Sequence, residues 1–398
     1  MSLIQMIEDA EYHSLLIEAS AADFLHGALE LSEGDFGWKQ PMRFLSVQQR
    51  ALGSCQAWHP GLYRHMGRTS AGICLEFETD STEVALELRA QPLWGGIKTL
   101  VASAVMGNEN YDGVSCEVDG RWLAPSWGQP RMPTAEDVAP IEDFADEKPK
   151  ERQLRRDPGR LVSFVLSDSA TAASAGLMAL PGLGKTHHVR LWLPCLYAVE
   201  IRRLFGDGTF LKAVDMRPVL LVMGDAATQG LAAGDPARTW AARLARINDW
   251  DLLNQGIVGQ VFQPGMAASL YEAKLSLAGI VVSFGESLRH EQCQEREVAR
   301  NVRAFLAEIA RMWPHTPCWV LTPFWHDEDN SPTHPHSCFE SLLPMLEANV
   351  AAHDEMRLVD GCELMECRSR ALGGNSGLPG DAAHKSIAHR LEAIFQEY

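Results

Sequence analysis

The stretch that most constrains the fold is 219–230, Val-Leu-Leu-Val-Met-Gly-Asp-Ala-Ala-Thr-Gln-Gly. Its first four residues are apolar, which is the length and character of a buried parallel strand. The strand runs directly into a turn of glycine, aspartate and small residues, and α/β sheets present their chemistry at this carboxyl edge. The sequence therefore predicts an α/β sheet with this turn at its functional edge.

Strand and helix patterns alternate after residue 217. Apolar residues recur at helical spacing in 236–247 and 296–313, and 386–398 has the pattern of a closing helix. Alternation of this kind is typical of a parallel sheet covered by helices on both faces, so we expect an α/β fold in this half. The expected strands after the first are 251–254, 278–284, 318–323 and 356–360.

The region from about 25 to 208 has the signature of β structure. Apolar and polar residues alternate in 72–79 and 83–89, which is the period of strands with one buried face. Asp119-Gly120 is the strongest hairpin signal in the chain. Many short strands separated by turns favour a sandwich or jelly roll. Further expected strands are 161–166 and 189–194.

Length and layout predict two domains. A chain of 398 residues is longer than one average domain and can bury two cores. A proline-rich, charged stretch at 130–160 is expected to form a long surface loop. We expect an N-terminal segment at 1–24, an all-β sandwich or jelly-roll domain at 25–210 and an α/β domain at 217–398.

Composition and charge exclude several classes of protein. The formal charge of −17 repels phosphate backbones and anionic lipid, and no apolar run is long enough to span a bilayer, so we expect neither nucleic acid nor membrane as a partner. No secretory signal is visible at the start of the chain. Nine cysteines without a Cys-x-x-Cys pair argue against a disulfide framework, and reduced thiols predict a cytoplasmic protein.

Four motifs in the second half resemble the signature blocks of the SGNH/GDSL ester hydrolases. They follow the order of that family and cover roughly the last 180 residues. The resemblance implies a flavodoxin-like parallel sheet and the ancestry of a serine ester hydrolase. The matching motifs are Gly224-Asp225-Ala226 with Thr228-Gln229-Gly230, then Asn254-Gln255-Gly256, then Gly285-Glu286-Ser287, and finally Asp381-Ala-Ala-His384.

The resemblance implies a catalytic role for three of these positions. Position 226 would carry the nucleophile, His384 would be the general base and Asp381 the carboxylate that orients its ring. Acyl transfer needs all three, because the hydroxyl must lose its proton to an imidazole of the correct tautomer. Here Ala226 occupies the nucleophile position, and a methyl group cannot attack an ester.

The resemblance also implies an oxyanion hole. The backbone N–H groups of Ala226 and Gly256 would be two donors, and position 287 would supply a side-chain donor, with Asp225 and Asn254 in supporting places. Ser287 stands where the family has asparagine, which leaves a shorter hydroxyl. Without the family, Gly256 would be explained as a residue of a tight turn and Ser287 as the cap of a strand end.

Two hypotheses of different classes follow. The chain is an acyl-ester hydrolase silenced by alanine at one position, or it is a natural pseudoenzyme that kept a pocket as a ligand-binding or regulatory module. The residue typical of the family is replaced in two of the four motifs, at positions 226 and 287, which favours the pseudoenzyme slightly. A third option, with Thr228 or Ser287 as the nucleophile, requires a hydroxyl displaced from the strand end.

The layout of a β region before the α/β region is similar to two-domain carbohydrate esterases and acyltransferases of the family. This implies a small-molecule or carbohydrate ester, sugar-like or otherwise hydroxylated, held between the domains. No cofactor is expected, because Gly184-Lys185-Thr186 lacks the earlier glycine of a phosphate loop. No metal is expected either, since His326, Asp327, His334 and His336 lack a regular ligand spacing.

Overall fold

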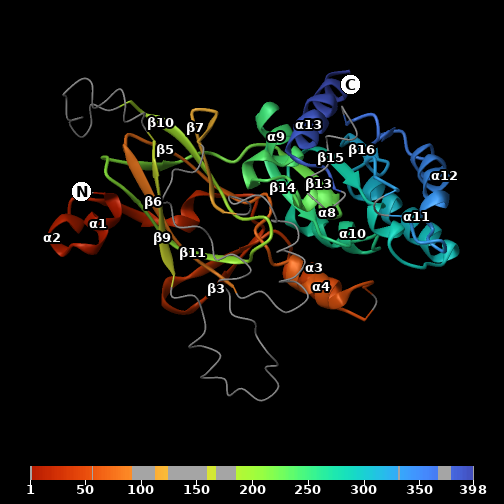
Figure 1. Ribbon diagram of the computed structural model, residues 1–398, viewed down its shortest axis with the longest axis horizontal. Helices are drawn as coiled ribbons and strands as arrows, with labels where there is room; N and C mark the ends of the chain where they lie inside the picture. Colours follow the sequence, from red (N-terminus) through yellow and green to blue (C-terminus); the bar gives the residue numbers. More distant parts are fainter. Residues whose placement is uncertain are drawn as a thin grey trace, which may run out of the picture.

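The computed structural model describes residues 2–55, 57–91, 113–123, 159–166, 185–329, 332–365 and 378–397. Within them the chain forms two antiparallel sheets and, after residue 218, one parallel sheet (Figure 1). The loop expected at 130–160 lies outside the described residues, apart from its last two positions.

The second half is a parallel sheet of five strands in the order β14-β13-β15-β16-β17. Every neighbouring pair is parallel, which confirms the α/β fold expected there. The strands are β13 (Val219–Gly224), β14 (Asp251–Gly256), β15 (Leu277–Ser283), β16 (Cys318–Leu321) and β17 (Met356–Val359). The helices are α8 (Ala226–Gln229), α9 (Trp240–Ile247), α10 (Met266–Leu270), α11 (Glu295–Met312), α12 (Phe339–Val350) and α13 (Asp381–Gln396).

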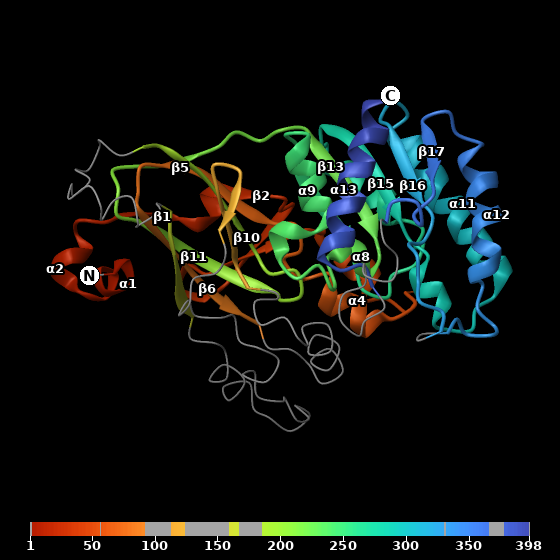
Figure 2. The same cartoon turned by 45° about the horizontal axis from the view of Figure 1, so that its top comes forward.

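Helices cover both faces of this sheet (Figure 2). Leu220 and Val222 of β13 pack with residues of α9 and α13, whereas Leu221 and Met223 pack with residues of α10, α11 and α12. Successive side chains of a strand point to opposite faces, so a strand covered on both sides is apolar at every position. This is why the run at 219–223 is continuously apolar.

The first half is an all-β sandwich of two antiparallel sheets. One has the order β3-β4-β11-β6-β9 with β1 beside β11, and the other β12-β5-β10-β7-β8 with β2 beside β5. The first sheet contains β1 (Ile17–Ser20), β3 (Glu30–Glu33), β4 (Lys39–Met42), β6 (Glu83–Ala90), β9 (Arg160–Val165) and β11 (Val199–Gly206). The second contains β2 (Leu25–His26), β5 (Cys74–Thr79), β7 (Ser115–Val118), β8 (Arg121–Leu123), β10 (His187–Trp192) and β12 (Leu211–Ala213).

Among the described residues, four short α-helices accompany the sandwich. The sequence pattern did not predict them, because three or four residues per apolar face leave little periodicity to detect. Two of them, α3 and α4, lie below the parallel sheet in Figure 1, where α3 contacts α10. They are α1 (Leu3–Glu8), α2 (Ala10–His13), α3 (Ser46–Leu52) and α4 (Pro60–Met66).

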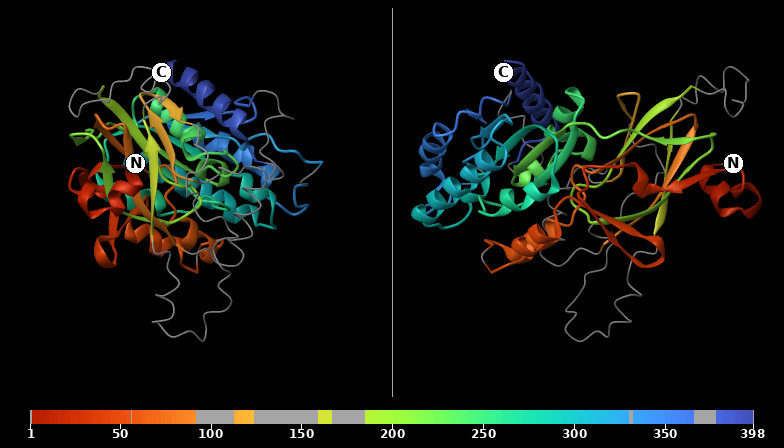
Figure 3. Two further views of the ribbon diagram at one scale, coloured as in Figure 1. Left: turned by 60° about the vertical axis from the view of Figure 1, so that its left-hand side comes forward. Right: turned by 180° about the vertical axis from the view of Figure 1, so that it is seen from behind.

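The two halves lie side by side and share a core (Figure 3). One hydrophobic cluster contains Leu75 and Leu204 of the sandwich together with Leu221 and Ile280 of the parallel sheet. The division into domains at 210 and 217 stays a prediction. Among the described residues, every helix is too short or too polar to cross a membrane.

Two local predictions have clear outcomes. Asp119 (φ 51°) and Gly120 (φ 77°) form the turn between β7 and β8, so the predicted hairpin is confirmed, with the two positive φ angles of a type I′ turn. The last helix begins at Asp381 and not at 386, so that prediction of its start was wrong. Both Asp381 and His384 therefore lie in its first turn, where they face the N-terminus of α9.

Candidate active site at the carboxyl edge of the parallel sheet

The turn after β13 is a tightly packed corner. A Cβ at Gly224 would lie 2.2 Å from the Thr228 hydroxyl, and one at Gly256 would lie 2.4 Å from the backbone N of Gln229. Only glycine fits at either position, because atoms this close cannot be accommodated without moving the backbone. Ala226 begins α8 with 8% of its surface exposed, while Thr228 is fully buried. A nucleophilic Thr228 would therefore have no access to substrate in this structure.

His384 binds the start of α9. Its Nδ1 accepts the backbone N–H of Trp240 at 3.0 Å, so this ring caps the first turn of a helix. A neutral ring that accepts at Nδ1 carries its proton on Nε2. That is the opposite tautomer from the one a general base needs at Nε2.

The surroundings of His384 favour the neutral ring. Complete burial, together with the positive charge of Arg243, lowers the pKa of His384 to about 3, and the backbones of Leu231 and Pro379 offset this only in part. The Nε2 atom has no hydrogen-bond partner among the described residues. Leu231, which also donates its N–H to the Ala226 carbonyl at 3.0 Å, links this ring to the nucleophile position.

The Asp381 carboxylate is bound by two arginines. One oxygen accepts from Arg238, and the other accepts from Arg243 at 2.6 Å. The structure therefore places Asp381 in ion pairs with Arg238, just before α9, and with Arg243 on α9, and the Nδ1 of His384 is occupied by a backbone group instead. Its assignment as the orienting carboxylate stays a prediction.

The predicted donor Gly256 is already engaged. Its N–H donates to Asn254 Oδ1 at 2.8 Å, and Asn254 Nδ2 donates to the Thr228 carbonyl at 2.7 Å. Asn254 thus joins the end of β14 to the corner, and its role as a supporting residue of the site stays a prediction. Three positions further on, Gly259 lies beyond β14 with φ 77°, half-buried, and its N–H makes no bond within the described part of the chain. The sequence analysis did not single out Gly259, although the second glycine of Gly-Ile-Val-Gly is a signal that could have identified it.

Asp225 contacts the backbone of Glu286, and sequence reasoning missed this contact. Burial, and then the charge of Glu286, raise the pKa of Asp225 to about 8, although the backbone N–H groups of Glu286, Gly285 and Ala227 act in the other direction. Glu286 N–H donates to Asp225 Oδ2 at 3.1 Å. Burial of Asp225 therefore favours its protonated form.

The same glutamate also meets His326, which follows β16. Its Oε1 lies 3.1 Å from His326 Nδ1, and its Oε2 accepts from Arg289 at 3.0 Å. Ser287 lies in the same short helical turn and is half-buried. The ends of β13, β15 and β16 therefore bring together Asp225, Glu286 and His326, which come from three separate parts of the sequence.

A cavity of about 820 Å³ opens near this edge between the two halves. Glu291 holds Trp58, a lining residue, and His59 in place. One of its carboxylate oxygens accepts from Trp58 Nε1, and the other lies 2.8 Å from His59 Nε2. Tyr63 of α4 donates its hydroxyl to the Gly259 carbonyl at 2.5 Å. The lining combines aromatic rings with amide side chains, including Trp58, Phe262, Gln263, Gln292, Gln294 and Asn301.

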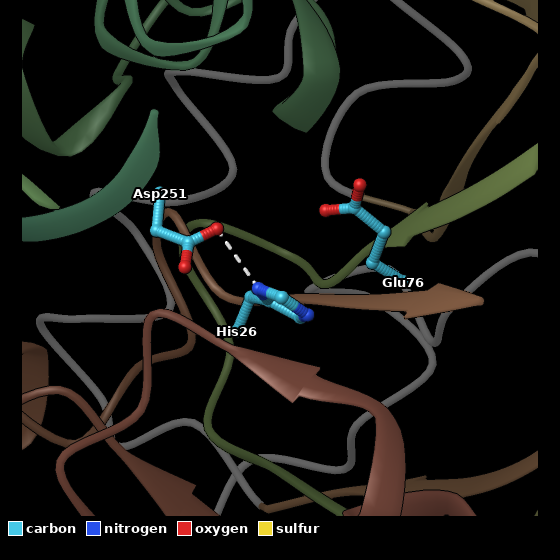
Figure 4. Close-up of side chains that lie close together, drawn as sticks. All are labelled: His26, Glu76 and Asp251. Carbon is cyan, nitrogen blue, oxygen red and sulfur yellow. Dashed lines mark hydrogen bonds and ion pairs between the residues drawn. The ribbon is translucent and has the colours of Figure 1, made fainter. Parts of the chain in front are cut away.

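A buried polar junction joins the halves elsewhere. His26, Glu76 and Asp251 bring their donor atoms within 4.8 Å of one another, close enough for one metal ion (Figure 4). However, Glu76 already accepts from Arg217 and lies 3.0 Å from Arg190, and Arg217 also contacts Asp251 at 2.9 Å. The hollow between them is only about 10 Å³. Two guanidinium groups thus balance the two carboxylates, and a divalent cation would have to displace them.

No protein-family model and no curated protein matches this sequence. Solved structures resemble it over nearly its whole length. A protein described as a GDSL-like lipase from Bacteroides ovatus is 13% identical with a TM-score of 0.65, covering 96% of this chain and 97% of that one. A salicylyl-acyltransferase from a tetracycline biosynthetic pathway is 18% identical, with a TM-score of 0.64 and coverage of 96% and 98%.

A family two carbohydrate esterase from Cellvibrio japonicus is 10% identical with a TM-score of 0.59, covering 96% of this chain and 97% of that chain. Identities this low report on the fold alone, since one fold hosts many activities. The similarity covers 96% of this chain in each case, so it spans both the antiparallel sheets and the parallel sheet. The chain therefore has an SGNH hydrolase-like fold.

Proposed function

We propose that this chain binds a ligand at the carboxyl edge of its parallel sheet and does not hydrolyse esters by a serine mechanism. The observation that carries this is the bond from Trp240 N–H to His384 Nδ1, because it holds the histidine in a tautomer that cannot accept a proton at Nε2. Ala226 at the nucleophile position agrees with it. The other hypothesis, an ester hydrolase silenced by Ala226 alone, requires this bond to break.

The proposed ligand is a small hydroxylated molecule, a carbohydrate or its ester. The cavity lined by Trp58 and Gln263 supports this, because its amide side chains suit hydroxyl groups and its indole offers a flat apolar surface for a sugar ring. We include acetylated sugars among the proposed ligands because one structure of similar fold is an acetyl xylan esterase from Butyrivibrio proteoclasticus. It is 11% identical, with a TM-score of 0.52 over 96% of this chain and 98% of that one.

Replacing Ala226 with serine is expected to leave ester hydrolysis at background. The new hydroxyl would face a histidine whose Nδ1 is already bonded, so no base is available. Rates with p-nitrophenyl acetate and butyrate should stay within about twofold of the wild-type chain, whereas a restored site should gain several orders of magnitude. The control is His384→Ala in the same background. Turnover that depends on His384 would establish the silenced hydrolase and overturn the binding hypothesis.

Replacing Trp58 with alanine is expected to weaken sugar binding about 5- to 10-fold, the loss of roughly 1–1.5 kcal/mol of aromatic contact. Calorimetry with an acetylated xylo-oligosaccharide and its deacetylated form measures this. Trp122→Ala is the matched control, because Trp122 is a partly exposed tryptophan on β8, outside the cavity lining. Equal affinity in the wild type and Trp58→Ala, or no heat with either sugar, would argue against this ligand class.

A further inference from the structure

Two loop segments lie against each other beside the cavity. The N–H of His334 donates to the Arg289 carbonyl at 2.8 Å, and the N–H of Cys293 donates to the His336 carbonyl at 3.3 Å. These bonds align the segment that follows β15 with the segment that precedes α12. They place Cys293 opposite Cys338, although 45 positions separate the two in the sequence.

The sulfur of Cys293 contacts the backbone of Cys338. The N–H of Cys338 donates to Cys293 Sγ at 2.9 Å. Both cysteines are free thiols in this structure. Disulfide formation requires backbones close enough for the two sulfur atoms to meet, and the contact of Cys293 Sγ with the Cys338 backbone favours that approach.

The two cysteines differ in access. Cys338, with 4% of its surface exposed, is buried immediately before α12, whereas Cys293 is half-buried and lines the cavity of about 820 Å³. Burial, then the hydrogen bond and charge of Cys293, raise the pKa of the Cys338 thiol to about 12. A reagent that enters the cavity therefore meets Cys293 first, and Cys338 stands behind it as the second thiol.

We propose that Cys293 and Cys338 form a site of thiol–disulfide exchange, in which Cys293 attacks a low-molecular-weight disulfide that enters the cavity and Cys338 resolves the adduct. In the first step the Cys293 thiolate attacks one sulfur of the small disulfide, giving a mixed disulfide and releasing one thiolate. In the second step the Cys338 thiolate attacks Cys293 Sγ, which forms the internal disulfide and releases the second small thiolate. The two cysteines lose two protons and two electrons, and the small disulfide gains both electrons.

The second step is favoured by the geometry once the first has occurred. Two causes of the raised pKa of Cys338, the hydrogen bond with Cys293 and its charge, are removed when Cys293 is capped, whereas burial, the largest cause, remains. The resolving thiol is already beside its target, so the step is intramolecular. The product would tie the segment carrying Glu286, Arg289 and Glu291 to the start of α12. Oxidation would thereby restrain the wall of the cavity nearest the sheet edge.

The test uses the full chain incubated with oxidised glutathione, quenched with acid and digested after aspartate and glutamate. Cleavage in the run Asp327-Glu328-Asp329 separates Cys338 from Cys318, which a tryptic peptide would hold together. Mass spectrometry should detect a Cys293–Cys338 cross-linked pair. Cys338→Ser should instead accumulate one glutathionyl group on Cys293. Cys293→Ser should leave Cys338 at least about 10-fold slower to react.

The matched control is Cys55→Ser, since Cys55 is exposed and lines the same cavity but has no role in the exchange. It should cross-link as the wild type does, and the oxidised chain should unfold at a higher temperature than the reduced one because a long loop is closed. A Cys55–Cys293 product would overturn the proposal. So would retention of both thiols under conditions that oxidise the urea-unfolded chain, or a Cys338→Ser variant that is modified elsewhere.

Discussion

Replacing Arg43 with alanine is expected to destabilise the fold by about 3–5 kcal/mol. Arg43 has no exposed surface and no carboxylate partner among the described residues, and its guanidinium is instead surrounded by backbone carbonyls. It donates to Thr69 O at 2.9 Å and Met66 O at 2.6 Å on the sandwich side, and to Asn254 O at 2.9 Å and Gly256 O at 2.6 Å on β14.

The physical reason is the number of acceptors that lose their partner together. Burial lowers the pKa of Arg43 to about 9, so the group still carries its charge at neutral pH and makes charge-assisted bonds. Alanine would remove a charge-assisted donor from four buried carbonyls and leave a cavity where the side chain was, and both effects raise the free energy of the folded state. Because two acceptors belong to each half, the substitution weakens the contact between the two halves.

Urea unfolding of Arg43→Ala beside Arg50→Ala measures this effect. Arg50 lies on the adjoining helix α3 with an exposed side chain, so its removal should change stability by less than about 0.5 kcal/mol. Arg43→Met is a second variant that keeps much of the volume and isolates the lost hydrogen bonds. A loss below about 1 kcal/mol in Arg43→Ala would mean that water replaces the guanidinium and that the junction is less closely packed than the structure indicates.

Glu76→Gln is expected to destabilise the chain by about 3–5 kcal/mol at neutral pH. It is also expected to reduce the fall in the free energy of unfolding that the wild type shows in acid. The Glu76 carboxylate of β5 is almost fully buried and is bound by Arg217, Arg190 and His188. Burial alone would raise the pKa of Glu76, but the bonds from His188, Arg217 and Arg190 outweigh it and hold the pKa well below its usual value.

The direction of the pH effect follows from that depressed pKa. A carboxyl group whose pKa is lower in the folded chain contributes stability that is complete above its unfolded pKa of 4.5 and is lost as the pH falls toward the folded value. The wild type should therefore lose this contribution progressively below about pH 4.5. Glu76→Gln lacks it at every pH, so the difference between the two proteins should shrink as acid is added.

Chemical unfolding at several pH values from 7 down to 3 checks this expectation. The matched control is Glu78→Gln, two positions along the same strand, where the exposed carboxylate pairs with Lys212 at 2.8 Å and should contribute little. If the free energies of unfolding of the wild type and Glu76→Gln differed by the same amount across this range, the loss of stability in acid could not be assigned to Glu76.

Local pattern predicted much of the architecture. The strands of the parallel sheet were expected within a few residues because both of their faces are covered, which makes the sequence continuously apolar at 219–223. The hairpin at Asp119-Gly120 was predicted because two positive φ angles restrict the choice of residue. The short helices α3 and α4 were missed because their apolar faces span only one or two turns.

Some residues of the candidate site were likewise predicted from the sequence, and others became evident only in the structure. Motif order brought the corner at Ala226, the supporting Asn254 and the pair Asp381 and His384 to attention from sequence alone. It did not reveal Gly259 as the glycine beyond the strand, nor the meeting of Asp225, Glu286 and His326. Those residues converge because three strand ends share one sheet edge, which is a property of topology and not of spacing along the chain.

The sequence by itself determined that this chain forms an α/β sheet after an all-β region, because the spacing of its apolar residues indicates which positions of each strand and helix are buried. It also determined that no serine stands at position 226. Only the tertiary structure decided what His384 binds, because the proton on an imidazole depends on which group meets each ring nitrogen, and here the first N–H of α9 meets Nδ1. Hydrogen-bond partners and burial are set by distant segments that packing brings together, so the chemistry of this edge could be assessed only after the fold was known.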